Sequence, residues 1–274
     1  MKIDLRDIFS TFFSKLDLRL VRESHYLKNM STLSELQSLR FRETRNGFLF
    51  DFLREVSDSS TVKENLYKSQ SQLLQDIFVA GMLEWKRNGF FVEFGATNGV
   101  DLSNTFMLEK DFGWTGILAE PGRNWHRELL KNRAASISTE CVWGQNGMEL
   151  EFIESEFPEF STIKIFENYD GMQLSRNARR KYLVKTITLE GLLTKFNAPN
   201  HIDYISIDTE GSEFEILKDF NFEKFSFGIL TVEHNYSENQ KLIDELLSSH
   251  GYSRIHANIS QFDGWYVNDA LLGR

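Results

Sequence analysis

Short apolar runs alternate with helical segments from Phe90 onward, and this alternation constrains the fold more than any other feature of the sequence. The runs predict five strands: FFVEFG (residues 90–95), GILAEP (116–121), ISTECVWG (137–144), IDYISIDTEG (202–211) and FGILTVEHN (227–235). Segments with helical periodicity lie between most of them, such as residues 123–132 and 212–220. Apolar strands separated by helices are typical of a parallel sheet covered on both faces. Because crossovers between parallel strands are right-handed, we predict a doubly wound α/β fold with its ligand crevice at the carboxyl ends of the strands.

Both ends of the chain depart from this alternation. YSRIHA (residues 252–257) and GWYVND (residues 264–269) are strand-like runs close in sequence, which predicts an antiparallel hairpin at one edge of the sheet. Residues 1–68 carry apolar side chains at helical spacing, so we predict a helical N-terminal extension. A further helix is predicted over residues 69–86 and is closed by Asn88 and Gly89. We therefore expect two parts, the extension and an α/β domain over residues 69–274.

One polar segment, residues 156–181, interrupts the alternation within this domain. Long irregular insertions are more often functional than accidental, so we expect a loop or flap over the crevice, with an exposed excursion of no function as the alternative. Its basic side chains could bind a phosphate or a nucleotide-linked sugar, because guanidinium groups suit such ligands, although a solvated run of charge is the more common outcome. These side chains are Arg176, Arg179, Arg180 and Lys181.

Length, charge and cysteine content exclude several classes of protein. A chain of 274 residues is long enough for one α/β domain with an extension, and a net charge of −9 argues against a broad nucleic-acid-binding surface. The single cysteine, Cys141, excludes an internal disulfide and a zinc site built from several cysteines, and it fits a reducing compartment. No uncharged apolar run is long enough to cross a bilayer, and the first residues lack the apolar core of a signal peptide. We expect a cytoplasmic protein that neither binds nucleic acid nor spans a membrane.

Acidic residues stand at the ends of the predicted strands. They are Glu93, Glu120, Asp208, Glu210 and Glu233. In a doubly wound sheet these ends share one rim, so the five carboxylates are expected to lie near one another. Any one of them alone could be a helix cap or a loop residue, but five in register predict a functional site.

The turn after the first strand, residues 95–99, indicates what this site binds. It differs from the dinucleotide-binding pattern G-x-G-x-x-G, because Thr97 replaces the middle glycine and Glu93 precedes the turn. A carboxylate there would repel a pyrophosphate and attract an ammonium or sulfonium group. Glu120 follows at about the separation at which an acid accepts the hydroxyls of an adenosine ribose. The pattern therefore favours a cationic nucleoside without phosphate, such as S-adenosylmethionine, over a nicotinamide or flavin cofactor.

Several segments together resemble the FkbM family of class I S-adenosylmethionine-dependent methyltransferases. They are SQSQLLQD, VEFGATNGVDLSNT, AEPGRNW, CVWGQNG and IDYISIDTEGSEFEIL. The last is similar to the most distinctive segment of the family, a strand that ends in Asp-x-Glu-Gly before a helix. The resemblance covers residues 69–268 and implies a Rossmann-like, seven-stranded methyltransferase sheet. It also implies an O-methyltransferase that acts on a sugar or glycan, or on a natural-product hydroxyl.

The resemblance also assigns cofactor-binding residues. Glu93, Gly95 and Gly99 match the motif that holds the methionine part, Glu120 matches the ribose-binding acid, and Cys141 with its neighbour matches the adenine site. The candidate cofactor-binding residues are Glu93, Gly95, Ala96, Thr97, Asn98, Gly99, Ser103, Asn104, Glu120, Pro121, Cys141, Val142 and Asp208. For Ser103 and Asn104 the alternative is capping of the next helix. The Cys141 thiol itself is more readily explained as a small buried apolar group, and Trp143 as either an adenine-stacking or a core residue.

Transfer of a methyl group to a hydroxyl needs a base, and the candidates are Asp208, Glu210, Glu233 and His234. His234 titrates near neutral pH, but neighbouring strand residues point to opposite faces, so only one of Glu233 and His234 can face the crevice. A satisfied, non-catalytic histidine is the alternative. These acids could instead hold a divalent cation, although their spacing does not establish one and we predict no metal ligands.

The sequence leaves the identity of the acceptor and of other binding partners undecided. The acceptor is expected to be a sugar, a glycan or another hydroxyl-bearing small molecule, on which Tyr169 or Trp265 could stack. A methyltransferase fold that binds without catalysis is the non-enzymatic alternative. A nucleic-acid methyltransferase is disfavoured by the acidity and by the lack of an Asn/Asp-Pro-Pro-aromatic motif. The N-terminal helices could cover the acceptor site or form a homodimer interface.

Overall fold

A computed structural model describes residues 59–155, 161–163 and 178–273 of the chain. The predicted helices before residue 59 and most of the polar segment, including Tyr169 and Arg176, lie outside the described residues. Among the described residues, no helix combines the length and the apolar character needed to cross a membrane.

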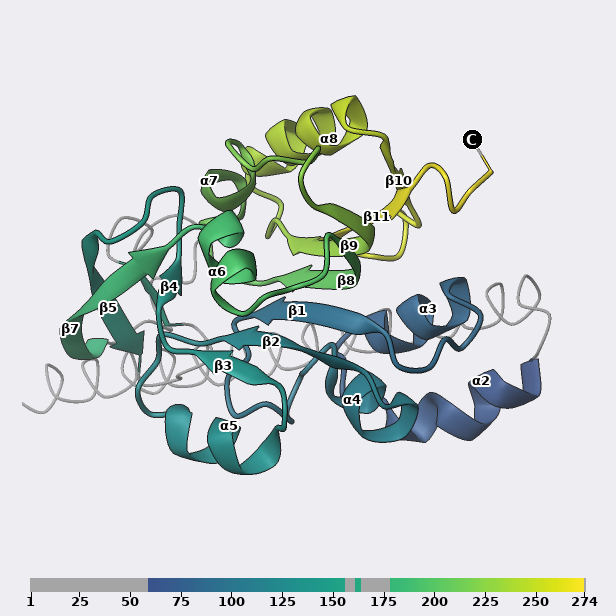
Figure 1. The fold of residues 1–274 in the computed structure, drawn as a ribbon, viewed down its shortest axis with the longest axis horizontal. Helices are drawn as coiled ribbons and strands as arrows, with labels where there is room; N and C mark the ends of the chain where they lie inside the picture. Colours follow the sequence, from purple (N-terminus) through teal and green to yellow (C-terminus); the bar gives the residue numbers. More distant parts are fainter. Residues whose placement is uncertain (1–58, 156–160, 164–177, 274) are drawn as a thin grey trace, which may run out of the picture. The chain divides into compact units, whose positions relative to one another are not determined.

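A seven-stranded sheet with the order β10-β11-β9-β8-β1-β2-β3 forms the centre of the described domain (Figure 1). Its strands are β1 (Phe90–Phe94), β2 (Thr115–Ala119), β3 (Ser136–Ser138), β8 (His201–Ile207), β9 (Ser226–Glu233), β10 (Tyr252–Ile255) and β11 (Asp263–Asn268). Five neighbouring strands of this sheet pair in parallel, in the order β9, β8, β1, β2 and β3. In contrast, β11 is antiparallel to both β9 and β10. The predicted parallel sheet and its C-terminal antiparallel hairpin are therefore confirmed.

Helices cover both faces of this sheet (Figure 1). One face carries α3 (Gln75–Met82), α4 (Phe106–Phe112) and α5 (His126–Asn132), and the other carries α6 (Leu189–Lys195), α7 (Glu213–Leu217) and α8 (Asn239–Ser249). The short helices α2 (Ser59–Asn65) and η1 (Leu66–Lys68) precede α3. Both faces bury apolar side chains, which explains why the parallel strands read as continuous apolar runs.

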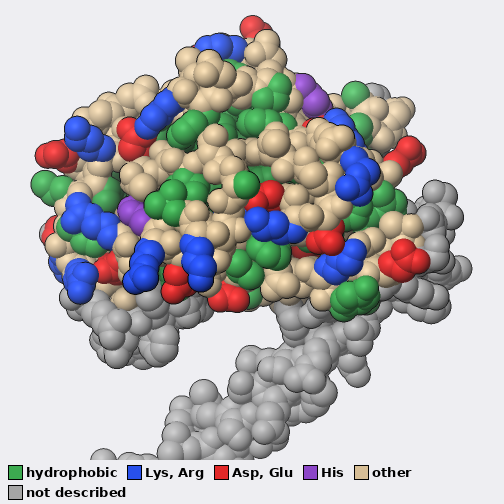
Figure 2. Space-filling model, turned by 60° about the horizontal axis from the view of Figure 1, so that its bottom comes forward, with side chains coloured by type: hydrophobic (Ala, Val, Ile, Leu, Met, Phe, Trp, Pro, Cys, Tyr) green, Lys and Arg blue, Asp and Glu red, His purple; other side chains and the backbone are tan. Residues whose placement is uncertain are grey.

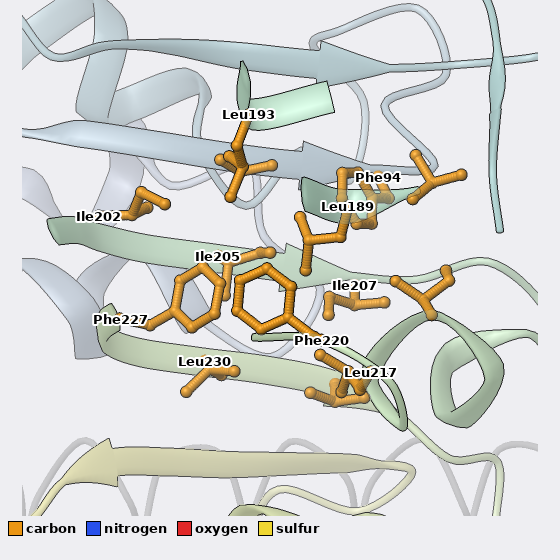
Figure 3. Packing of buried hydrophobic residues seen from close by; sticks show 14 of the residues in the cluster. Phe94, Leu189, Leu193, Ile202, Ile205, Ile207, Leu217, Phe220, Phe227 and Leu230 are labelled. Carbon is orange, nitrogen blue, oxygen red and sulfur yellow. The ribbon is translucent and has the colours of Figure 1, made fainter. Parts of the chain in front are cut away.

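The core under α6 and α7 joins four parallel strands. Figure 3 shows Phe94, Ile205 and Leu230 from three neighbouring strands packed with Leu189 and Leu217 of the two helices. All of these side chains are at most 1% exposed. Burial on this scale stabilises the domain by roughly 1.5–3 kcal/mol for each large side chain. The core therefore holds the carboxyl ends of the strands in a fixed arrangement.

A second, four-stranded sheet lies beside the central one, and the sequence did not predict it. Its order is β4-β7-β5-β6, with the strands β4 (Cys141–Val142), β5 (Glu149–Ser155), β6 (Thr162–Ile163) and β7 (Ala178–Ile187). The predicted single strand over residues 137–144 is wrong, because β3 stays in the central sheet while Cys141 and Val142 pair with Thr186 and Ile187 of β7.

The prediction of a loop or flap over residues 156–181 is wrong at two places, where the structure has strands. Thr162 and Ile163 form β6, and residues 178–181 begin β7; both strands pair with β5. Arg180 and Lys181 are therefore exposed strand residues. A strand with charged outward residues lacks the apolar run that marks a buried strand, which explains the wrong interpretation.

The helix predicted over residues 69–86 is shorter than expected. Only Gln75–Met82 is helical, because Leu74 adopts a left-handed conformation with φ 64° and Ser71 forms a parallel bridge with Leu102. Buried Asp76 accepts hydrogen bonds from Ser69 Oγ at 2.6 Å and from the Gln70 N–H at 3.3 Å, which holds the preceding residues in a loop. Local polar contacts therefore override the apolar periodicity of this segment.

Gly95 allows the ends of β1 and β8 to approach closely. Its φ is +71°, and a Cβ at this position would lie 2.1 Å from the backbone oxygen of Asp208. Only glycine fits such a contact, and the contact brings Glu93 and Asp208 to the same edge of the sheet.

We predict that Gly95→Ala destabilises the protein more than Gly147→Ala does. Gly147 has a similar φ of +72° but nothing within 4 Å of the added Cβ, so its substitution should cost only the roughly 1–2 kcal/mol of left-handed strain. At Gly95 the clash with a backbone oxygen should add about 1–3 kcal/mol. Urea unfolding of the two variants measures the difference, and equal losses would show that the close approach is not needed.

Candidate functional site

An open pocket lies at the carboxyl ends of β1, β2 and β8 and is bounded by residues of the second sheet. The predicted cofactor-binding residues that line it are Glu93, Gly95, Thr97, Ser103, Asn104, Glu120, Pro121, Cys141, Val142 and Asp208. Glu210, one of the candidate bases, also lines it. The fold therefore brings most of the candidate residues to one cavity, although their roles stay predictions.

The pocket is acidic. Its lining includes the carboxyl groups of Glu93, Asp101, Glu120, Asp208 and Glu210. Among the described residues that line it, none is a lysine, arginine or histidine. Such a cavity attracts cationic groups and repels phosphates.

Glu120 is held in the pocket wall by two backbone donors. Its Oε2 accepts from the Thr97 N–H at 2.9 Å, and its Oε1 accepts from the Gly122 N–H at 2.6 Å. Burial raises the pKa of this carboxyl to about 7, while the two backbone hydrogen bonds act in the opposite direction. The ordered carboxyl group is therefore a candidate acceptor for ligand hydroxyls.

Glu93 organises the loop that follows the first turn. Its Oε1 accepts from the Asn104 N–H at 2.7 Å, and its Oε2 accepts from the hydroxyls of Ser103 at 3.0 Å and Thr105 at 2.5 Å. These contacts place the loop against the pocket. Glu93 thus has a structural task that the sequence did not indicate, in addition to its negative charge at the pocket.

Arg133, which the sequence did not indicate, connects this loop to α4. Its guanidinium group donates to Glu109 Oε2 at 2.8 Å, to the Gly99 carbonyl at 3.0 Å and to Thr105 Oγ1 at 2.8 Å, and it lies 3.6 Å from Glu93 Oε2. The side chain is fully buried. Arg133 follows a charged helical run, which is usually exposed, so no sequence signal marked it.

Three predicted cofactor-binding residues belong to the turn of residues 95–99 but do not line the pocket. Gly99 packs on α5, where an added Cβ would lie 2.6 Å from Arg133 Cγ. Asn98 Oδ1 accepts from the N–H groups of Val100 and Asp101, which fixes the turn. Ala96 is 1% exposed. None of the three is a lining residue of this pocket, so their contact with a ligand stays a prediction.

Asn104 presents an unpaired acceptor in this pocket. Its Nδ2 donates to Ser206 Oγ at 2.9 Å, whereas its buried Oδ1 has no hydrogen-bond partner among the described residues. A buried acceptor without a partner is unfavourable, and a bound ammonium or hydroxyl donor would satisfy it.

Three carboxylates meet at the ends of β8 and β9. Asp208, Glu210 and Glu233 each offer an oxygen, and these atoms lie within 4.8 Å of one another. Burial and then the charge of Asp208 raise the pKa of Glu233 well above its ordinary value. Asp208 and Glu210 line the pocket, whereas Glu233 does not. Carboxyls with raised pKa values can accept a proton near neutral pH.

Comparison with known proteins now identifies the family. Residues 93–254, more than half of the chain, match the family model of the methyltransferase FkbM domain. The chain belongs to the FkbM methyltransferase family. This confirms the family that the sequence motifs predicted.

Structural comparison adds little to this assignment. A protein of Pyrococcus horikoshii, described provisionally as an RNA methyltransferase, is 13% identical to this FkbM family member, with a TM-score of 0.33. The match covers 66% of this chain and 66% of that chain, so the chain spans just under two thirds of it. A likeness this weak gives no information on substrate or mechanism. No curated protein matches the chain.

His234 does not line the pocket of this FkbM methyltransferase. Its ring is buried, Nδ1 accepts from the Tyr236 N–H at 3.1 Å, and Nε2 lies 3.1 Å from the Arg254 guanidinium. Burial and the neighbouring Arg254 charge lower its pKa to about 4. The geometry therefore does not support His234 as the base, and it matches the alternative of a satisfied histidine.

The sequence missed the apolar and hydroxyl side chains that complete the pocket. Phe152 and Ile163 come from β5 and β6, and Ser161 and Thr162 lie beside them. Their position depends on pairing between strands distant in sequence, so no local pattern could reveal it. The Cys141 thiol is buried, and burial raises its pKa to about 12, so it remains neutral and acts as a small apolar surface.

From the raised pKa values of the buried carboxyls we predict that the free energy of unfolding falls as the pH rises. Burial is the main cause that raises the pKa of Glu120, of Glu213 and of Asp263 to about 7. The folded state therefore binds their protons more tightly than the unfolded chain, and this stability is lost as pH rises through 7. Each group should lower the free energy of unfolding by about 1 kcal/mol between pH 6 and pH 8. The sum of about 3 kcal/mol corresponds to roughly 6–12 °C in melting temperature.

Melting temperatures measured at constant ionic strength from pH 6 to pH 8 test this expectation. Glu120→Gln removes one of the three groups and should reduce the decrease by about a third, whereas Glu128→Gln, at an exposed position on α5, should leave it unchanged. A melting temperature that rises across this range would contradict the pKa assignments.

Proposed function

We propose that this FkbM family member is an S-adenosylmethionine-dependent O-methyltransferase and that its acceptor is a hydroxyl group of a sugar or glycan. The observation that carries the proposal is the acidic pocket, with five carboxyl groups and no basic side chain among its described lining residues. A cofactor that is cationic and lacks phosphate suits this charge, whereas a pyrophosphate does not. The strand order with a C-terminal antiparallel pair supports the Rossmann-like methyltransferase topology.

The residues of the pocket fit each part of S-adenosylmethionine. The Glu120 carboxylate suits the two ribose hydroxyls, and the unpaired Asn104 Oδ1 suits the ammonium group. Val142, Phe152 and Ile163 offer an apolar surface for adenine. When bound, this cofactor supplies a methyl group whose bond to sulfur breaks, with the electron pair returning to sulfur, as the acceptor oxygen attacks.

The chain itself must orient the acceptor and remove its proton. Asp208 and Glu210 line the pocket and can accept the hydroxyl proton, which is worth typically 10²–10⁴-fold in rate. Orientation of the two reactants by a rigid pocket can supply roughly 7–11 kcal/mol. The fixed ends of β1 and β8 provide this rigidity.

Hydroxyl side chains favour a polar acceptor. They are Ser161, Thr162, Thr209 and Ser212, which all line the pocket on its β6 and α7 side. Three of them already donate within the protein, to the Glu210 carbonyl, to Glu213 Oε1 and to Thr209 Oγ1, so they offer acceptor oxygens to the hydroxyls of a sugar. An acceptor of the natural-product class, with a larger apolar surface, is the second candidate. The surface also supports a small-molecule acceptor over a nucleic acid, because Lys and Arg side chains intersperse with Asp and Glu on the face that Figure 2 shows.

Transfer of labelled methyl groups tests this function. The full chain is incubated with methyl-labelled S-adenosylmethionine and with nucleotide-linked sugars, oligosaccharides or polyketide alcohols, and the products are analysed by mass spectrometry. We expect labelled methyl ethers on the sugars and a loss of about 10²-fold or more in kcat for Asp208→Asn. Transfer only to the polyketide alcohols would replace the sugar assignment, and cofactor binding without transfer to any acceptor would support a non-catalytic module.

A further inference from the structure

The ends of β8 and β9 place three carboxylates around one point. The two strands are parallel neighbours in which Ile207 lies opposite Val232, so Asp208 and Glu233 directly follow a matched pair. Glu210 returns to the same point through a left-handed backbone conformation with φ 58°. One oxygen from each carboxylate lies within 4.8 Å of the others.

Glu233, a member of this cluster, has an unsatisfied oxygen. The residue is 9% exposed, and its buried Oε2 has no hydrogen-bond partner among the described residues. None of the described basic side chains forms an ion pair with Glu233 or with Asp208. A buried carboxylate oxygen without a donor, next to two further acids, is unfavourable unless a proton or a cation neutralises the cluster.

We propose that Asp208, Glu210 and Glu233 bind one divalent cation with a preference for oxygen ligands, such as Mg²⁺ or Mn²⁺. Oxygens that share one such ion, at about 2.1–2.5 Å each, lie at most about 4–5 Å apart, which agrees with the cluster. Three carboxylates satisfy only part of the coordination shell, so water or a substrate oxygen completes it.

The position of the cluster suggests what the cation does. Asp208 and Glu210 line the pocket while Glu233 lies behind them, so the cation is accessible from the pocket. A hydroxyl oxygen of the acceptor can bind at an open coordination position, which fixes the acceptor and makes its proton more acidic, and a carboxylate oxygen of Asp208 or Glu210 that does not bind the cation can then accept this proton. This role in acceptor binding rests on the proposed function, whereas binding of the cation itself does not.

Titration with MnCl₂ tests the site. The full chain is stripped with EDTA and dialysed, and free Mn²⁺ is followed by electron paramagnetic resonance. We expect one saturable site, with binding weakened at least about tenfold in Glu233→Gln and unchanged in Glu128→Gln, which removes an exposed acid of α5. Because Glu233→Gln removes a like charge from the cluster, this variant should melt no lower than the wild type in EDTA and should lose the stabilisation by Mn²⁺.

The outcomes separate this site from the proposed function. Absence of saturable Mn²⁺ binding, or equal affinity in the wild type and Glu233→Gln, would overturn the cation site. A titration of the same preparation with S-adenosylhomocysteine in EDTA is the independent measurement. Binding of Mn²⁺ without binding of S-adenosylhomocysteine would support the cation site and contradict the proposed function, and the converse would overturn the cation site alone.

Discussion

Glu120→Ala should weaken the binding of S-adenosylhomocysteine by about 100-fold or more. The carboxylate is ordered by the Thr97 and Gly122 N–H groups and faces the pocket, where it can accept two ribose hydroxyls. A hydrogen bond to a charged group contributes about 1.5–3 kcal/mol, so the loss of two corresponds to at least about two orders of magnitude in Kd. Isothermal titration calorimetry measures this change.

Two further variants make the Glu120 result specific. Glu120→Gln keeps the shape of the side chain and one oxygen acceptor, and it should weaken binding less than Glu120→Ala does. Glu128→Ala, on the exposed face of α5, should bind S-adenosylhomocysteine as the wild type does. Melting temperatures show whether the loops at Thr97 and Gly122 stay folded. Unchanged affinity in a folded Glu120→Ala protein would refute the ribose assignment.

Arg133→Met should destabilise the protein by roughly 3–5 kcal/mol, because removal of one partner leaves uncompensated buried charge. The fully buried guanidinium group contacts Glu109 at 2.8 Å and Glu93 at 3.6 Å and holds the carbonyl of Gly99. Without it, the loop of residues 99–105 loses its link to α4. Urea denaturation followed by circular dichroism measures the loss.

The control for this substitution is Arg127→Met, an exposed arginine on the same helix, α5. It should change stability by no more than about 0.5 kcal/mol. Adding Glu93→Gln to Arg133→Met should recover part of the loss if unpaired charge is its cause. Similar stability of Arg133→Met and Arg127→Met would show that the buried network does not hold the loop.

Much of the central sheet was predictable because its signals are local. The strands β1, β2, β8 and β9 each combine an apolar run with a following turn residue, and both of their faces are buried by helices. The rule that ligands lie at the carboxyl ends of parallel strands then places Glu93, Glu120 and Asp208 at one pocket.

The remaining features depend on contacts between distant parts of the chain. The separation of β4 from β3 follows from its pairing with β7, in which Cys141 lies opposite Thr186, 45 residues later. Arg133 is buried because the loop of residues 99–105, Glu109 and two phenylalanine rings surround it. His234 had the right residue type for a base, but the contact with Arg254 occupies its ring. Sequence patterns identify elements and strand ends, whereas such long-range contacts decide which side chains reach the pocket.

Parallel titrations of the wild-type chain with S-adenosylmethionine and with NAD⁺ test the central claim that the carboxyls at this edge of the sheet hold a phosphate-free cationic nucleoside. The account predicts saturable binding of S-adenosylmethionine and no detectable binding of NAD⁺. Binding of NAD⁺ with no binding of S-adenosylmethionine would contradict it.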